Sequence, residues 1–241
     1  ARDWASPTLA LVLAVALGLA SSSPSTATLG EGPGSAAERQ LEVMEQAVPL
    51  LAGMLWRDQS GARLPARARG GGNRMDVEAA DLDADGDLDL VVAVEFGRNM
   101  VLLNDGSGHF RDATPAAFSG ARDSEDIAIA DFDGDGHLDL VFVSEDDQVN
   151  KRYRGDGAGG FEAERALPLA GTSNAVLAED LDGDGDVDLL LGNAGQNTRL
   201  VNGGSGRFED GTEGRLPARG DATQDIEAGD VDGDGDLDLV F

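Results

Sequence analysis

The sequence predicts an all-β fold: a β-propeller of four-stranded blades, present as an open partial ring, with a short helical segment near the N-terminus. A nine-residue pattern with Asp at positions 1, 3, 5 and 9 and Gly at position 6 starts at Asp81, Asp131, Asp180 and Asp230. These starts lie 50, 49 and 50 residues apart (131 − 81, 180 − 131, 230 − 180), a repeat length typical of propeller blades or solenoid units. Positions 2, 8 and 10 of each pattern are apolar, so polar and apolar side chains alternate out of the loop into an expected β-strand.

The N-terminal residues 1–27 are expected to form a signal peptide or an N-terminal anchor. The apolar run from Thr8 to Ala20 is short for a membrane span but suits the apolar region of a signal peptide. Arg2 precedes this run, and small residues near Ala20 and Ala27 offer cleavage sites. An uncleaved anchor is the alternative. The chain starts without Met, so we expect further sequence upstream.

Residues 28–54 are expected to form a linker with a short amphipathic helix. Ser35 to Glu38 has the form of a capping box, and we expect the helix to break near Pro49. Packing against the neighbouring domain is the simpler role, and a coiled-coil partner is the alternative. The apolar residues of this helix follow one another three or four positions apart: Leu41, Met44, Val48, Leu51 and Leu55.

Residues 55–241 are expected to form the partial propeller, with repeats that start near residues 75, 125, 174 and 224. In the second repeat the expected strands are Asp126 to Ala130, Asp139 to Val143, Gln148 to Tyr153 and Phe161 to Arg165, with Gly-rich turns between strands. The chain stops at Phe241, inside the second strand of the fourth repeat. We therefore expect an exposed strand edge there.

The segment 55–67 resembles the end of the third repeat. Trp56 to Arg67 matches Phe208 to Arg219 at an offset of 152, near three periods. We interpret residues 55–67 as a lone fourth strand that closes a blade beyond Phe241.

The nine-residue patterns predict up to four calcium sites. Carboxylates at alternate positions around a Gly turn supply the oxygen ligands of a hard divalent cation. The variable position 7 is expected to bind through its backbone carbonyl. Mg²⁺ fits less well because it resists dehydration, and an EF-hand would need Glu at position 12, where this chain has apolar residues. The alternative is four acidic turns that bind nothing. The candidate ligands are Asp81, Asp83, Asp85, Asp87, Asp89, Asp131, Asp133, Asp135, His137, Asp139, Asp180, Asp182, Asp184, Asp186, Asp188, Asp230, Asp232, Asp234, Asp236 and Asp238.

The charge of the chain argues against two classes of partner. It has 46 acidic and 18 basic residues among 241, a net charge of −28, and no Cys. Four Ca²⁺ ions would leave about −20, which still repels nucleic acids and anionic membranes. Without Cys there is no disulfide framework and no thiolate metal site.

The loops together with the turns that follow them resemble the FG-GAP/VCBS repeat family, whose blades form the calcium-bearing propeller of integrin alpha chains and many secreted bacterial proteins. The resemblance covers Met75 to Phe241 and rests on D-x-D-x-D-G-x-x-D followed by N-D-G-x-G-x-F. It implies calcium ligands at positions 1, 3, 5 and 9, a carbonyl ligand at position 7, and about seven blades. It also implies ligand binding opposite the ion loops, on Glu95 to Arg98, Ala116 to Arg122, Glu145 to Gln148, Leu169 to Asn174, Asn193 to Asn197 and Arg219 to Gln224.

These observations predict a binding or adhesion module that is secreted, periplasmic or on the cell surface. We expect its Ca²⁺ to be structural, its ligand to be an unknown protein or carbohydrate, and this part of the protein to have no catalytic activity. The alternative is the propeller of an extracellular carbohydrate-active enzyme with catalytic residues outside this chain. His109 and His137 have no nucleophile and carboxylate beside them in the sequence. Repeat geometry accounts for the Gly and Asp of the integrin-binding tripeptide at Arg154 to Asp156, and adhesion through it is the alternative. The Arg-rich stretch from Arg63 to Arg74 is expected to be a solvated link, with anion binding as the alternative.

Overall fold

The computed structural model describes residues 58–70, 72–118, 123–146, 148–218 and 220–241. The chain divides into two compact units, residues 1–58 and 59–241, and the fold below is that of the second. The predicted signal peptide or anchor (1–27) and the linker with its helix (28–54) lie outside the described residues. Within the described part, no helix has the length and apolar character needed to cross a membrane.

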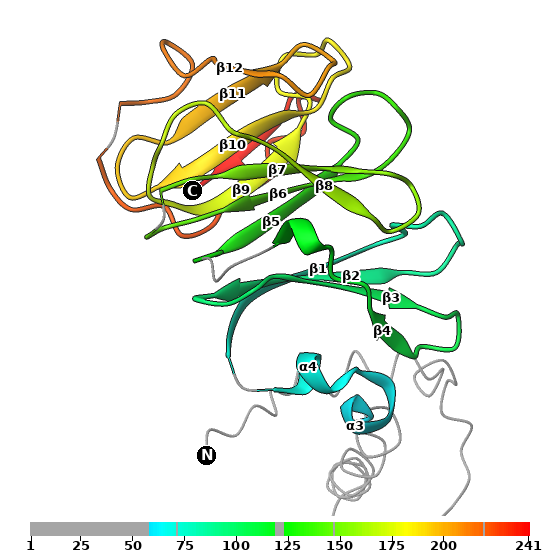
Figure 1. Cartoon of the computed structure of the whole chain (residues 1–241). Coiled ribbons are helices and arrows are strands. Elements are labelled where there is room, and N and C mark those ends of the chain that lie inside the picture. Colours follow the sequence, from blue (N-terminus) through cyan, green and yellow to red (C-terminus); the bar gives the residue numbers. More distant parts are fainter. Residues whose placement is uncertain (1–57, 71, 119–122, 147, 219) are drawn as a thin grey trace, which may run out of the picture. The chain divides into compact units, whose positions relative to one another are not determined.

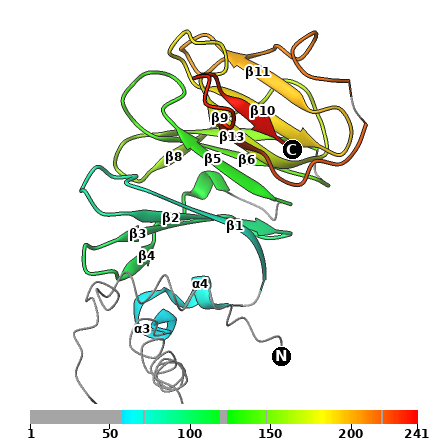
Figure 2. The same ribbon diagram turned by 180° about the vertical axis from the view of Figure 1, so that it is seen from behind.

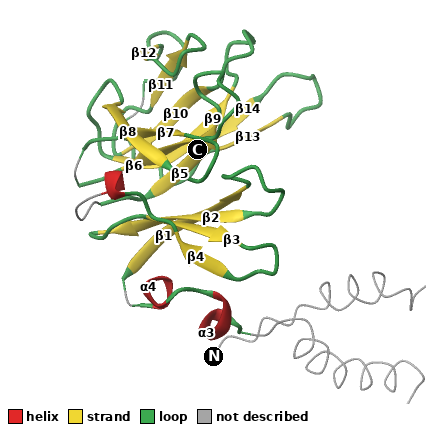
Figure 3. Cartoon of the chain, turned by 45° about the vertical axis from the view of Figure 1, so that its right-hand side comes forward, coloured by secondary structure: helices red, strands yellow, loops and turns green. Residues whose placement is uncertain are grey.

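The second unit contains three four-stranded antiparallel sheets, followed by a two-stranded one (Figures 1 and 3). Neighbouring strands within each sheet are consecutive in the chain. The strands of the first sheet are β1 (Asn73–Ala80), β2 (Asp89–Glu95), β3 (Met100–Asn104) and β4 (Phe110–Asp112), and those of the second are β5 (Asp126–Ala130), β6 (Asp139–Val143), β7 (Lys151–Gly155) and β8 (Phe161–Ala166). The third sheet has β9 (Ser173–Glu179), β10 (Asp188–Asn193), β11 (Thr198–Asn202) and β12 (Phe208–Asp210), and the last has β13 (Glu227–Gly229) and β14 (Asp238–Val240).

The predicted fold class, an open partial propeller of four-stranded blades, is confirmed. In the second repeat, β5 and β6 have the predicted bounds, whereas β7 begins three residues later and ends two residues later than predicted. β8 ends one residue later than predicted. The predicted alternation of polar and apolar side chains does not continue along the second strands of the four-stranded sheets, which are buried along nearly their whole length.

The core lies between consecutive sheets. Leu140 and Phe142 of β6 pack with Val91 and Val101 of the first sheet, whereas Val141 of β6 packs toward the third sheet. Since successive side chains of a strand point to opposite faces, β6 is buried along its whole length. Each such fully buried side chain contributes roughly 1.5 to 3 kcal/mol.

Phe118, in the short 3₁₀ helix Ala116–Phe118, adds an aromatic cluster to the first of these cores. Its ring centroid lies 5.4 Å from that of Phe142 and 4.6 Å from that of Tyr153, which are favourable edge-on contacts. Leu239 of β14 and Ile226, just before β13, pack against Leu190 of the third sheet, and Figure 2 shows β13 beside that sheet. Phe241 itself is half exposed, as expected for an open edge.

The prediction of a strand at residues 55–67 is wrong for the part that is described. Residues 58–67 contain the short helices α3 (Ser60–Arg63) and the start of α4 (Ala66–Arg69), and residues 55–57 lie outside the described chain. Pro65 separates the two helices, and Ala and Arg favour helical turns. Leu64 and Ala68 pack against Val92 and Met100 on the outer face of the first sheet, so this segment covers a sheet face instead of pairing with an edge.

Candidate metal centre

Each acidic pattern joins the first and second strands of its sheet, so all four lie at equivalent places in the repeat. We name them loop 1 (residues 81–89), loop 2 (131–139), loop 3 (180–188) and loop 4 (230–238). Position 9 of each loop is the first residue of the second strand.

The first Asp of each loop shapes the turn through its own carboxylate. In loop 2, Asp131 Oδ1 accepts the backbone N–H groups of Gly134 (2.9 Å) and Asp135 (3.2 Å), and Oδ2 accepts that of Gly136 (2.8 Å). Asp230 makes the same three contacts in loop 4. Gly136 has a φ of 87°, a left-handed conformation that Gly adopts without steric cost. The invariant Gly of the pattern therefore has the role that the sequence predicts.

The ninth Asp links the loop to the third strand through hydrogen bonds. Asp89 is fully buried, and its two oxygens accept the N–H groups of Leu82 (3.0 Å) and Asn104 (2.7 Å). Asp139 and Asp188 are equally buried and make equivalent contacts to β7 and β11. Burial raises the pKa of Asp89, and the nearby carboxylates of Asp83 and Asp85 add to the rise.

Each loop brings three carboxylates within metal-binding distance. One oxygen from each lies within 4.8 Å of the other two, and Ca²⁺–oxygen bonds of 2.3 to 2.6 Å would let one ion reach all three. The donors are oxygen only, as a hard cation requires, so the residues fit Ca²⁺. The grouped residues are Asp81, Asp83 and Asp85; Asp131, Asp133 and Asp139; Asp180, Asp182 and Asp184; and Asp230, Asp232 and Asp234. The other candidate ligands, Asp87, Asp89, Asp135, His137, Asp186, Asp188, Asp236 and Asp238, stand outside these groups.

The side chain at position 7 turns toward the hairpin between the third and fourth strands. Added Cβ atoms on Gly106 and Gly157 would collide with Asp87 and His137 respectively. Asp186 lies against Gly204 in the same way. This placement leaves the backbone carbonyl of position 7 as its available donor, and its role as a ligand stays a prediction.

Sequence reasoning missed two arginines that enter the loops from neighbouring strands. Arg152 is buried and bonds Asp133 (2.8 Å) and Asp139 (2.8 Å), and it also donates to the Gly206 carbonyl of the next sheet (2.8 Å). Arg199 pairs in the same manner with loop 3, contacting Asp182 (3.2 Å) and Asp188 (2.9 Å). The equivalent position in the first sheet is Val101, because Val91 pairs with Val101 as Val141 pairs with Arg152. Aligning the third strands of the repeats would have revealed the difference.

Arg154 adds a third basic contact, again to loop 2. It lies 2.6 Å from Asp135 and 3.0 Å from Asp133, and its hydrogen bond holds the pKa of Asp135 below the usual range. Gly155 donates its N–H to Asp139. The Arg-Gly-Asp tripeptide is therefore tied into the loop through its first two residues.

One of the two histidines does have a serine and a carboxylate nearby, which the sequence analysis did not anticipate. His109 Nδ1 lies 2.7 Å from Ser107 Oγ, and Ser107 Oγ donates to Asp105 (2.6 Å). All three are in one exposed turn. The carboxylate accepts hydrogen bonds from the serine hydroxyl and the backbone N–H of His109, whereas the imidazole ring contacts the serine. A catalytic triad needs the reverse order, with the carboxylate orienting the histidine.

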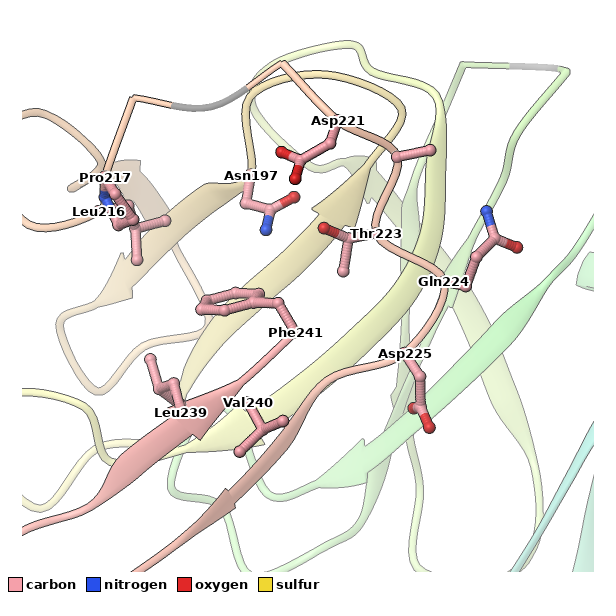
Figure 4. Close-up of a pocket in the computed structure, with 11 residues that line it drawn as sticks. Asn197, Leu216, Pro217, Asp221, Thr223, Gln224, Asp225, Leu239, Val240 and Phe241 are labelled. Carbon is pink, nitrogen blue, oxygen red and sulfur yellow. The ribbon is translucent and has the colours of Figure 1, made fainter.

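A cavity of about 720 Å³ lies away from the loops, beside the last sheet (Figure 4). Asn197, Thr223 and Gln224 line it together with the apolar side chains of Leu216 and Phe241. Asn197 and Gln224 belong to the segments that the family resemblance implies for ligand binding.

The fold has partial counterparts among solved structures. A lectin of Agrocybe aegerita that recognises non-reducing terminal N-acetylglucosamine aligns with a TM-score of 0.43 and 25% identity over 56% of this chain and 36% of its own. The V. cholerae biofilm matrix protein Bap1 aligns with a TM-score of 0.43 and 18% identity over 70% of this chain and 28% of its own. The chain thus spans about a third of the length of these structures. No curated protein sequence matches it.

The repeats themselves match a known sequence family. The profile of the FG-GAP-like repeat matches residues 81–142, 131–191 and 180–241. Each match begins at the first Asp of one loop and extends into the second strand of the next repeat. The matches together cover more than half of the chain, which therefore belongs to the FG-GAP-like repeat family.

Proposed function

We propose that this chain is the calcium-binding propeller part of a secreted or cell-surface protein that binds a protein or carbohydrate ligand. The observation that carries the proposal is the convergence of three carboxylate oxygens within 4.8 Å in each of the four loops. Like charges at such distances repel unless a cation neutralises them.

Calcium is the ion that this donor set favours. It accepts six to eight oxygen ligands in flexible geometry, whereas Mg²⁺ demands a tight octahedron and keeps its waters. The ion would link the turn to the second strand and cancel part of the loop's charge, so its role is structural. An extracellular setting suits the proposal, because calcium is millimolar there and extracellular modules bind it weakly.

Calcium titration with thermal unfolding tests the metal half of the proposal. At free Ca²⁺ tenfold above Kd, each site adds about 1.4 kcal/mol, and four independent sites add about 5 to 6 kcal/mol. We expect isothermal titration to give at least three bound ions and the melting temperature to fall steeply in chelator. Equal Mg²⁺ serves as the control and should restore little of the loss. A chain that melts at the same temperature with Ca²⁺ and with chelator would contradict the proposal.

Ligand binding is proposed for the edge opposite the loops, where the turns between second and third strands lie. Asn197 and Gln224 are on this edge and line the cavity described above. A glycan array and a panel of immobilised extracellular matrix proteins would be probed with the wild type, Asn197→Ala and Gln224→Ala. Ser205→Ala, in an exposed hairpin on the loop side, is the matched control. Binding that all four proteins share equally would rule out this edge.

The enzyme alternative remains second. Within the described residues, the contact among Asp105, Ser107 and His109 is the arrangement nearest to a catalytic one, and its order and exposure do not favour catalysis. No specific observation therefore supports that alternative over the binding module.

A further inference from the structure

A fifth group of three carboxylates lies outside the four loops. Glu95, Asp123 and Glu125 each place one oxygen within 4.8 Å of the other two, the same spacing as in the loops. Glu95 is the last residue of β2 in the first sheet, and Asp123 and Glu125 immediately precede β5 in the second. The group, which we name the junction cluster, therefore joins two blades. It lies at the ends of β2 and β5 that are remote from loops 1 and 2.

The acidic repeat does not account for the junction cluster. Glu95 lies 14 residues after the first Asp of loop 1, and Asp123 and Glu125 lie eight and six residues before that of loop 2. Three acids therefore coincide only at the junction between the first and second repeats. The equivalent residues are Glu145, Thr172 and Asn174 at the next junction, and Ala194, Ala222 and Gln224 at the one after.

Asp123, the central residue of the junction cluster, is buried, and one of its two carboxylate oxygens accepts a hydrogen bond. Asp123 is 3% exposed. Its Oδ2 accepts the N–H of Asp146 (2.6 Å), but its Oδ1 is shielded from solvent and has no hydrogen-bond partner among the residues that the structure describes. A buried acceptor without a partner costs about 1 to 3 kcal/mol, and more when it is charged. Such an atom therefore points to a missing donor or cation.

Within the described part of the chain, the cluster has no cationic partner. Of the arginines and lysines that the structure describes, none is ion-paired with any of its three carboxylates. Glu95 accepts a hydrogen bond from the neutral side chain of Asn73. Burial, followed by the carboxylates of Asp123, Glu145 and Glu95, raises the pKa of Glu125 to about 7. Loops 2 and 3 have arginines paired with their carboxylates, whereas among the described residues the junction cluster has none.

We propose that Glu95, Asp123 and Glu125 bind a divalent cation of the calcium type, at a site separate from the four loops. The unpartnered Oδ1 of Asp123 is the inner ligand, and the half-buried Glu95 and Glu125 complete an oxygen-only donor set. An ion held there bridges the first and second blades at the edge opposite the loops. Three carboxylates fill only part of a calcium shell of six to eight oxygens. The remaining positions are open to water or to an oxygen of a bound ligand.

Paramagnetic Mn²⁺ locates the site without relying on stoichiometry. Isotope-labelled chain in limiting Mn²⁺ should lose the amide NMR signals of Glu95, Ser124 and Glu125 as well as those of the loops. Loop 2 lies at the other end of β5, about 16 Å away for five residues of strand, so the two sets of signals are separable. The triple variant Glu95→Gln/Asp123→Asn/Glu125→Gln should keep the broadening at the loops and lose it at the cluster.

Calcium titration of the same proteins gives the second readout. The triple variant should bind one Ca²⁺ fewer than the wild type, whereas Asp83→Asn/Asp85→Asn should lose a loop site and keep the cluster. The single variant Glu125→Gln serves if the triple variant does not fold, and it should weaken this site at least tenfold. Unchanged stoichiometry, or broadening confined to the loops, would overturn the proposal. Broadening at the cluster alone would support it while contradicting calcium binding by the loops.

Discussion

Loops 1 and 2 share one backbone design but differ in how their charge is balanced. Loop 1 has five Asp, and among the residues described none of them is paired with Arg or Lys, so its formal charge is −5. Loop 2 has four Asp and the paired side chains of Arg152 and Arg154, which gives −4 + 2 = −2. The same acidic repeat thus occurs with and without built-in cations.

The difference shows that a metal-ligand motif can be neutralised in two ways. In loop 2 a guanidinium already occupies oxygens of Asp133 and Asp139, so an incoming ion must compete with it. In loop 1, no arginine or lysine of the described residues offsets the repulsion among Asp81, Asp83 and Asp85. We therefore infer that loop 1 depends more strongly on calcium, whereas loop 2 is partly preformed without it.

Arg152→Met should have the largest effect, because it makes loop 2 resemble loop 1 in its lack of a buried cation. The substitution leaves the fully buried Asp139 without its ion-pair partner. Breaking a buried pair in this way costs about 3 to 5 kcal/mol. Chemical denaturation in chelator would measure the loss, and Ca²⁺ should restore part of it. Arg154→Met is the control, because its side chain is half exposed and such pairs contribute at most about 1 kcal/mol. Equal losses of stability in Arg152→Met and Arg154→Met would contradict the expected difference between the buried and the half-exposed ion pair.

Asp83→Asn in loop 1 and Asp133→Asn in loop 2 should have different effects on the stability of the chain in chelator. In chelator, Asp83→Asn relieves repulsion and should not destabilise the chain, whereas Asp133→Asn removes a partner of Arg152 and should. In Ca²⁺ at tenfold above Kd, Asp83→Asn should forfeit about 1.4 kcal/mol of calcium-dependent stability, and Asp133→Asn less. Thermal unfolding in both conditions tests this. If both variants respond alike in chelator, the arginines do not matter to loop 2.

Asp135 of loop 2 and Asp89 of loop 1 should respond oppositely to pH in chelator, whereas Asp139, the loop 2 equivalent of Asp89, has a pKa raised by burial as well. The Arg154 hydrogen bond lowers the pKa of Asp135, so its stabilising contribution is present above the unfolded-state pKa and is lost as pH falls through the folded-state value. Burial raises the pKa of Asp89, so its contribution is present below the unfolded-state pKa and is lost as pH rises through the folded-state value. Carboxyl ¹³C NMR titration would resolve both groups. In Arg154→Met, Asp135 should return toward its ordinary range while Asp89 stays raised.

The fold and the loops could be predicted because their signals are local. Nine residues contain the whole turn, and a short apolar run that reads as a β-strand follows each loop. The arginines could not be found in this way, because the approach of Arg152 to Asp133 depends on the pairing of Val141 with Arg152 across two strands. The helices α3 and α4 were missed for a related reason. A match in sequence to a fourth strand says nothing about whether a partner strand is within reach.

His137→Ala should have the smallest effect and tests how position 7 contributes to loop 2. The imidazole is exposed and lies against Gly157, and the backbone N–H of His137 bonds Asp135 (3.0 Å) whatever the side chain is. If only the carbonyl binds, calcium affinity at loop 2 should change by less than about twofold, well under the 1.4 kcal/mol that a tenfold change represents. Calcium titration of His137→Ala in an Asp83→Asn/Asp85→Asn background would reduce the contribution of loop 1. A tenfold loss would make the imidazole itself a ligand, and loop 2 would then differ from loop 1 in its donor set as well as in its charge.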